Sequence, residues 1–176
     1  MVGKVIAKKV CLVGPFAVGK TSLVHRFVES IFSDTYLTTI GVKISKKQME
    51  MNDDQVQLMI WDIEGVDVFT ELKPSYLRGA AGVLLVLDGT RPKSVEMASE
   101  LSEILSKHLP GVPIIGLLNK SDLTYEWKLS EPDLKAIENL GINIIETSAK
   151  TGHNVELAFE TMINKMGLGS GVPESL

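Results

Sequence analysis

Apolar residues along this chain fall into two kinds of pattern. The continuous apolar run at residues 82–87 predicts a β-strand buried on both faces, and residues 8–13 and 112–118, rich in valine, leucine and isoleucine, predict two further strands. Between residues 93 and 108 the apolar side chains instead recur at the spacing of a helix that buries one face. The chain therefore mixes buried strands with amphipathic helices.

Taken along the whole chain, these patterns alternate strands with helices. Strands are expected at residues 8–13, 42–51, 55–62, 82–87, 112–118 and 143–146, and helices at 20–30, 69–77, 93–108, 131–140 and 155–166. Asn52, Asp53 and Asp54 predict a hairpin turn. This order predicts an α/β fold, a single-domain P-loop NTPase, in which about five helices flank a mostly parallel six-stranded sheet with one antiparallel edge strand. Ligand-binding loops are expected at the carboxyl ends of the strands.

Length, composition and charge indicate a single domain and give no sign of a nucleic-acid partner or a membrane span. The 176 residues and 44% hydrophobic content suit one domain, predicted at 1–166, followed by a flexible tail at 167–176. A net charge of -4 does not favour a nucleic-acid partner. Cys11 is the only cysteine, and no run reaches the roughly 20 apolar residues of a membrane span. We expect a cytoplasmic monomer with no integral membrane segment.

The most informative motif follows the first strand. Residues 14–21 read Gly-Pro-Phe-Ala-Val-Gly-Lys-Thr, which is the phosphate-binding pattern Gly-x4-Gly-Lys-Thr between a strand and a helix. Its backbone N–H groups would surround the phosphates, Lys20 would reach the β- and γ-oxygens, and Thr21 would offer its hydroxyl to Mg²⁺. The expected nucleotide contacts in this segment are Gly14, Ala17, Val18, Gly19, Lys20, Thr21 and Ser22.

Three later motifs follow other strands and complete the prediction. Asp62 and Gly65 form Asp-x-x-Gly, in which the carboxylate can hold Mg²⁺ and the Gly65 N–H can bond a γ-phosphate oxygen. In Asn119-Lys120-Ser121-Asp122 the Asp122 carboxylate can accept two hydrogen bonds from guanine, a donor pair that adenine lacks. Backbone N–H groups in the following Ser148-Ala149-Lys150 segment could bind the guanine O6. The base is therefore predicted to be guanine.

With these motifs in order, the chain resembles the Ras superfamily of small GTPases, and within it the Rab-like branch, across roughly residues 8–166. Residues 36–42 and 76–80 look like the Rab sequences at switch I and after switch II. The resemblance implies GTP/GDP and Mg²⁺ as ligands, with Thr39 binding Mg²⁺ beside Thr21 and Asp62. It also implies that Phe32, Tyr36 and Lys120 line the nucleotide, and that effector and exchange-factor proteins bind residues 33–43 and 62–78.

Two positions depart from that family pattern. Residues 62–67 read Asp-Ile-Glu-Gly-Val-Asp, whereas the family usually has Asp-Thr-Ala-Gly-Gln-Glu, so Val66 replaces the glutamine that orients the attacking water. Valine can neither donate nor accept a hydrogen bond. Phe16 replaces a small residue, and its ring would crowd the path of an arginine finger.

These departures leave alternatives open. The catalytic set would comprise Lys20, Gly65 and the Val66 position, with Glu64 as a speculative addition. We predict a guanine nucleotide switch that hydrolyses GTP slowly. One alternative is a hydrolysis-deficient, GTP-bound binding module, and another is a competent switch in which Glu64, Asp67 or a partner residue positions the water. An ATP-using P-loop kinase or ATPase shares the first motif, but Asn119 to Asp122 disfavours it.

Overall fold

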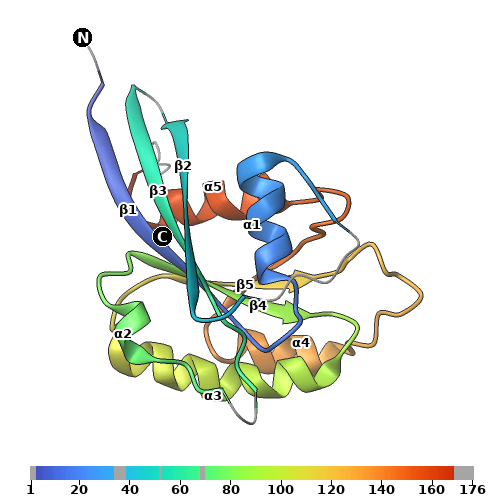
Figure 1. Ribbon diagram of the computed structural model, residues 1–176. Coiled ribbons are helices and arrows are strands. Elements are labelled where there is room, and N and C mark those ends of the chain that lie inside the picture. Colours follow the sequence, from blue (N-terminus) through green and yellow to red (C-terminus); the bar gives the residue numbers. More distant parts are fainter. Residues whose placement is uncertain (1–2, 34–38, 52, 68–69, 169–176) are drawn as a thin grey trace, which may run out of the picture.

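The computed structural model describes residues 3–33, 39–51, 53–67 and 70–168. Six strands form one sheet in the order β2-β3-β1-β4-β5-β6, in which β2 is antiparallel to β3 and every other pair is parallel. The strands are β1 (Val5–Val13), β2 (Val42–Met51), β3 (Asp54–Ile63), β4 (Gly82–Asp88), β5 (Ile114–Asn119) and β6 (Asn143–Glu146). In Figure 1, β1, β2 and β3 extend beyond the helices as a three-stranded blade that carries the N-terminus.

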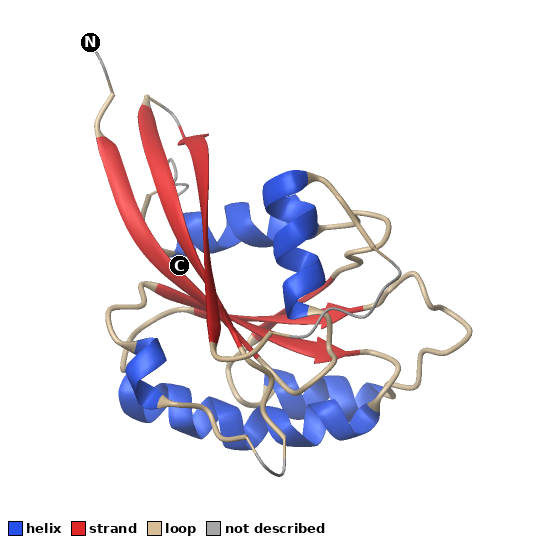
Figure 2. Ribbon diagram, viewed as in Figure 1, coloured by secondary structure: helices blue, strands red, loops and turns tan. Residues whose placement is uncertain are grey.

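Helices cover both faces of this sheet. They are α1 (Lys20–Glu29), α2 (Pro74–Leu77), α3 (Pro92–His108), α4 (Glu131–Glu138) and α5 (Val155–Lys165). Figure 2 shows α1 and α5 on one face and α2, α3 and α4 on the other. The predicted α/β architecture is confirmed, including the antiparallel edge strand. None of the helices in the described part of the chain is long and apolar enough to cross a membrane.

Each layer of helices closes its own core, and the strand patterns explain why. All seven residues of β4 are buried because helices cover it on both sides, whereas β2 alternates between exposed and half-buried positions as an edge strand does. Between α1 and α5 the rings of Phe27 and Phe159 stack with centroids 3.8 Å apart. Cys11 lies buried in the other core, beside α2 and α3, where it packs as a small apolar side chain.

One predicted helix is wrong in extent. The sequence predicts a helix over 69–77, but α2 begins at Pro74, with Lys73 in an extended conformation before it. Leu72 is buried in the α2 and α3 core, so the chain crosses this edge as a loop that inserts one side chain. Residue 69 lies outside the described residues.

The end of α5 is closed by its own backbone. Gly167 adopts a left-handed conformation with φ of 78°, its N–H bonds to Asn164, and the Leu168 N–H bonds to Ile163. This is the pattern of a helix end closed by glycine, and Leu168 packs against the α1 and α5 core. Residues 169–176 of the expected tail lie outside the described part of the chain.

Candidate nucleotide-binding site

The loop between β1 and α1 can take its path only with glycine at two places. A Cβ on Gly14 would lie 2.2 Å from the carbonyl oxygen of Val86, and one on Gly19 would lie 2.4 Å from the Asn119 amide nitrogen. Gly19 also has φ of 98°, a conformation that L-residues rarely adopt. The loop therefore packs directly against the ends of β4 and β5 and leads into the N-terminus of α1, where Ser22 lies in the first turn.

Lys20 at the start of α1 is turned back into this loop. Its ammonium donates to the carbonyl oxygens of Gly14 and Pro15 at 3.2 and 3.1 Å, and the side chain is buried. Burial lowers the pKa of Lys20 to about 8, although the nearby Asp62 carboxylate opposes the shift. A cation held this way under a phosphate-binding loop would gain strongly from an anionic ligand.

Three oxygen-bearing side chains meet beside Lys20. The hydroxyl oxygens of Thr21 and Thr39 are 2.5 Å apart, and the two hydroxyls donate to Asp62 Oδ2 at 2.7 and 3.1 Å. Asp62 Oδ1 is buried and has no hydrogen-bond partner among the residues that the structure describes. Burial raises the pKa of Asp62 against the hydrogen bonds from Thr21 and Thr39 and the charge of Lys20. Hydroxyl and carboxylate oxygens around an orphaned acceptor fit Mg²⁺, a hard cation that prefers such ligands.

Asn119 at the end of β5 connects the phosphate loop to the last predicted motif. Its amide nitrogen donates to the Val18 carbonyl oxygen at 2.9 Å. Its amide oxygen accepts from the Thr147 hydroxyl and the Ala149 N–H, both at 3.3 Å. One buried side chain thus fixes three segments that are distant in sequence.

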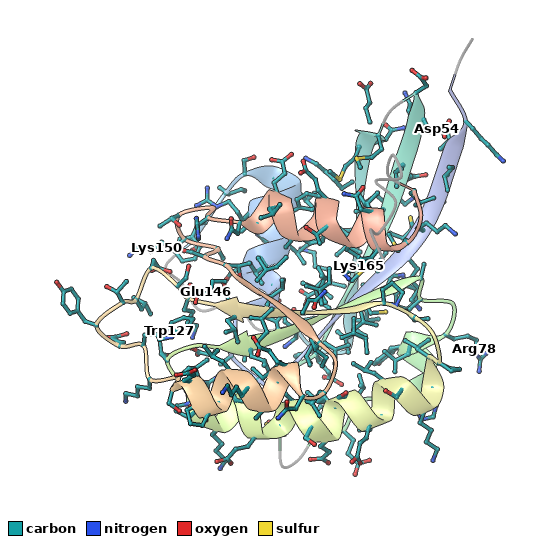
Figure 3. The ribbon with its side chains drawn as sticks, turned by 180° about the vertical axis from the view of Figure 1, so that it is seen from behind. Asp54, Arg78, Trp127, Glu146, Lys150 and Lys165 are labelled. Atoms are coloured by element: carbon teal, nitrogen blue, oxygen red, sulfur yellow. The ribbon has the colours of Figure 1, made fainter. Side chains whose placement is uncertain are left out.

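The loop after β6 is held from two sides. The Ser148 hydroxyl donates to Asp122 at 2.7 Å, which orients a carboxylate of the guanine motif. Arg26 on α1 donates to the Ala149 carbonyl oxygen at 2.7 Å and also to that of Lys150. The sequence analysis did not include Arg26, because no motif marks an arginine on the far end of α1. Figure 3 shows Lys150 and Glu146 on the same side of the molecule as Trp127.

A second residue that the sequence motifs do not mark is a buried carboxylate at the end of β4. Asp88 is fully buried and binds the Lys120 ammonium at 2.8 Å and the Arg91 guanidinium at 3.0 Å. Both cations also reach the phosphate loop, since Lys120 donates to the Ala17 carbonyl oxygen at 3.1 Å and Arg91 to that of Phe16 at 2.8 Å. The only mark of Asp88 in the sequence is an aspartate at the end of an apolar run.

The segment after β3, where the resemblance places switch II, continues the sheet as far as Val66. The Val66 N–H donates to the Gly14 carbonyl oxygen and the Phe16 N–H donates to the Val66 carbonyl oxygen, both at 3.0 Å. These bonds form a parallel bridge between Pro15 and Val66. The Val66 side chain packs against the α2 and α3 core. Gly65 lies so close that a Cβ there would be 2.5 Å from Phe16 Cα.

Glu64, the speculative catalytic residue, has a different partner. Its carboxylate accepts a hydrogen bond from the Gly41 N–H at 3.0 Å, and its own N–H donates to the Gly41 carbonyl oxygen at 2.8 Å. Asp67, the other acidic candidate, accepts from the Thr70 N–H at 2.7 Å. Both carboxylates therefore already accept a hydrogen bond from a backbone N–H group.

Other predicted residues lie as follows. Phe32 is partly buried against the α1 and α5 core, Lys150 is exposed, and Tyr36 lies outside the described residues. The phosphate loop, Thr39, Asp62, Gly65 and the two guanine motifs converge on the carboxyl ends of β1, β3, β4, β5 and β6.

A Gly-x4-Gly-Lys-Thr loop between a central parallel strand and a helix, with the other motifs at the same sheet edge, defines a P-loop nucleotide-binding domain of the GTPase type. Comparisons with known proteins agree. The family model described as Ras family matches residues 9–167. Ras-related protein Rab-13 of Canis lupus familiaris is 35% identical over 93% of this chain and 81% of its own length. Ras-related protein Rab-25 of Homo sapiens is 36% identical over 90% of this chain and 75% of its own length.

The chain belongs to the Ras family. It is a nucleotide-binding switch of the small GTPase type, on the Rab-like side of the family. Members of this family bind guanine nucleotides, generally with Mg²⁺. This assignment leaves the ATP-using alternative without support.

Proposed function

We propose that this protein binds GTP and GDP with Mg²⁺ in the site described above and hydrolyses bound GTP slowly. The backbone of Gly14, Ala17, Val18, Gly19 and Ser22 would surround the phosphates, with the Lys20 ammonium on the β- and γ-oxygens. The burial that lowers the pKa of Lys20 supports this role, because an anionic ligand beside the ammonium would offset the cost of burying its charge.

Magnesium would be held by Thr21, Thr39 and Asp62. The two hydroxyls already converge on one carboxylate oxygen, and the other oxygen of Asp62 has no described hydrogen-bond partner. When bound, the ion would neutralise phosphate charge. The raised pKa of Asp62 supports the same assignment, since a cation beside this carboxylate would offset the cost of its burial.

The base would lie between the two loops that Asn119 and Asp122 connect. The Asp122 carboxylate would accept from the guanine N1–H and amino group, and the Ala149 and Lys150 backbone would face O6. Lys120 would cover one face of the base and Phe32 its edge, with Tyr36 nearer the phosphates. The Ser148 hydroxyl supports this arrangement because it orients Asp122 from the second loop.

One observation carries the proposal of slow hydrolysis. Val66 occupies the position at which the family pattern has glutamine, and its side chain packs toward the core while its backbone bonds to the phosphate loop. No atom of a valine side chain can align a water with the γ-phosphorus. Gly65 would still present its N–H to the γ-phosphate.

The competent switch that uses its own carboxylate is the second candidate. The Glu64 carboxylate accepts from Gly41 N–H and that of Asp67 from Thr70 N–H, so neither is favoured as a water-positioning group. A residue supplied by a partner protein is the remaining form of this candidate. Phe16, 43% exposed at the mouth of the loop, would crowd an arginine that enters there.

Effector and exchange-factor proteins would bind residues 33–43 and 62–78. Ile40 is 90% exposed and Ile44 is 46% exposed on this side, which supports an apolar contact surface. We further propose that the protein acts as a monomer in the cytoplasm.

Single-turnover hydrolysis of bound GTP tests the proposal. Wild type, Val66→Gln and Phe16→Gly would be loaded with GTP, and GDP formation followed after Mg²⁺ is added. Val66→Gln should hydrolyse GTP about tenfold faster or more, because a glutamine amide cannot be buried in the core and would turn toward the phosphate. A wild-type rate equal to that of Val66→Gln would contradict the assignment of slow hydrolysis to Val66, and a wild-type rate that matches that of a glutamine-containing small GTPase would contradict slow hydrolysis itself.

A further inference from the structure

Glu64 joins the two switch segments by a pair of hydrogen bonds to a single residue. Its side chain accepts from the Gly41 N–H at 3.0 Å, and its main chain donates to the Gly41 carbonyl oxygen at 2.8 Å. The main-chain bond requires only that β2 and β3 keep their register, which any residue at position 64 would permit. The side-chain bond requires an acceptor, and alanine, the usual residue in the family pattern, has none.

The bonded residue lies next to the metal-binding side chains. Gly41 is two residues after Thr39, and Glu64 is two residues after Asp62. A bond between Gly41 and Glu64 therefore limits how far Thr39 can move from Asp62, to which its hydroxyl donates at 3.1 Å. Charge on the carboxylate strengthens such a bond.

The segment that carries Glu64 is itself fixed. Val66 exchanges two backbone hydrogen bonds with the phosphate loop, and its side chain packs against the α2 and α3 core. Ile63, on the other side of Glu64, is fully buried at the end of β3. The Glu64 carboxylate thus projects toward switch I from a rigid support.

We infer that Glu64 is a positioning residue that holds Thr39 at the magnesium site through Gly41, whether or not a γ-phosphate is bound. The inference rests on the proposed function for the identity of the site. In GTPases that order switch I through γ-phosphate contacts alone, the segment is released after hydrolysis. In this protein switch I would stay close to the metal site in the GDP form, so its two nucleotide states would differ less.

Amide hydrogen exchange at Gly41 tests this directly. Wild type, Glu64→Gln and Glu64→Ala would be compared in the Mg²⁺·GDP form and with a non-hydrolysable GTP analogue. Glu64→Gln keeps an oxygen acceptor, so its Gly41 amide should stay protected as in wild type. In Glu64→Ala the amide should exchange about tenfold faster in the GDP form and less so with the analogue. Glu71→Ala removes an exposed acid from the same segment and should leave the exchange unchanged.

Two results would overturn the inference. One is equal Gly41 exchange in wild type and Glu64→Ala with GDP bound, and the other is a loss of protection in Glu64→Gln as large as in Glu64→Ala. The nucleotide content of each preparation would be measured separately. Failure to bind guanine nucleotide would refute the proposed function, whereas the same Gly41 comparison on nucleotide-free protein would still decide whether Glu64 holds switch I.

Discussion

The guanine side and the γ-phosphate side of the site are built in different ways. On the guanine side, three side-chain contacts hold residues proposed to face the base: Asn119 accepts from the Ala149 N–H, Arg26 on α1 donates to the Ala149 carbonyl oxygen, and Ser148 donates to Asp122. On the γ-phosphate side, the Val66 backbone forms hydrogen bonds with the phosphate loop, and the Glu64 carboxylate accepts one from the Gly41 N–H. On the first side the contacts within the protein orient groups proposed to bind the base, whereas on the second side the residue at the glutamine position and the neighbouring carboxylate contact other parts of the protein.

This difference teaches that recognition and catalysis can be separated within one P-loop domain. Base recognition requires acceptors and donors at fixed places, and these are retained. Water positioning requires one polar side chain free to face the γ-phosphate, and at position 66 the chain offers an apolar one. Tight binding with slow hydrolysis is the expected combination.

Removing the guanine acceptor should have the largest effect. Asp122→Ala is expected to weaken GDP binding by about 100-fold or more, because guanine donors would lose their partner in a site built to bind them. Competition between GDP and ATP measures it. Glu126→Gln, an exposed acid in the same loop, should bind GDP as wild type does. If Asp122→Ala still prefers GDP over ATP strongly, the guanine side has been assigned to the wrong residues.

The metal site on the phosphate side should give the next effect. Thr21→Val keeps the side-chain shape but removes the hydroxyl that lies 2.7 Å from Asp62. GDP release from wild type should accelerate about tenfold or more when EDTA removes Mg²⁺, whereas Thr21→Val should release GDP quickly in both conditions. Unchanged Mg²⁺ dependence in the variant would show that the hydroxyl does not bind the ion.

Asp88 links both sides, and its loss should have a moderate effect. Burial opposes ionisation, but hydrogen bonds from Lys120 and Thr90 outweigh it and hold the pKa of Asp88 below its usual value. Asp88→Asn should therefore destabilise the fold by about 2 kcal/mol at neutral pH, because two cations lose a charged partner. Thermal unfolding measures this loss of stability. The variant should also release GDP faster than wild type does.

The stability difference between wild type and Asp88→Asn should depend on pH, because folding lowers the pKa of Asp88. A carboxyl whose pKa is lowered by folding contributes stability that is fully present above the unfolded pKa, about 3.9, and is lost as the pH falls through the folded pKa. The stability gap between wild type and Asp88→Asn should thus be constant from pH 7 to about 5 and shrink below the unfolded pKa. A gap that grows on acidification would contradict this account of Asp88.

Cys11 should give the smallest effect, since it belongs to neither side. Burial raises the pKa of its thiol to about 11, so almost no thiolate is present at neutral pH. Thiol-reactive reagents should modify it only after unfolding, with or without nucleotide. Rapid labelling of the native protein would mean that the α2 and α3 core opens readily, and it would contradict the claim that this core holds the Val66 side chain in place.

Sequence reasoning found the features whose spacing is fixed by the ligand. Gly14 to Thr21 and Asn119 to Asp122 are contiguous motifs, and the alternation of strands and helices needs only local periodicity. It missed Asp88 and Arg91, whose roles depend on β4 ending beside the phosphate loop. The bond from Gly41 to Glu64 depends on the register of β2 on β3, and the late start of α2 depends on Leu72 entering the core. Such contacts are fixed by tertiary packing and leave no local pattern.

The most direct test of the account is the fate of one bound GTP. Protein loaded with labelled GTP in Mg²⁺ would be chased with excess unlabelled GTP, and the released label separated into GTP and GDP. We predict that most of the label leaves wild type as GTP and that Val66→Gln shifts it toward GDP. Release of nearly all the label from wild type as GDP would show that hydrolysis outpaces dissociation, and it would contradict the claim that this site binds guanine nucleotide well but positions the water poorly.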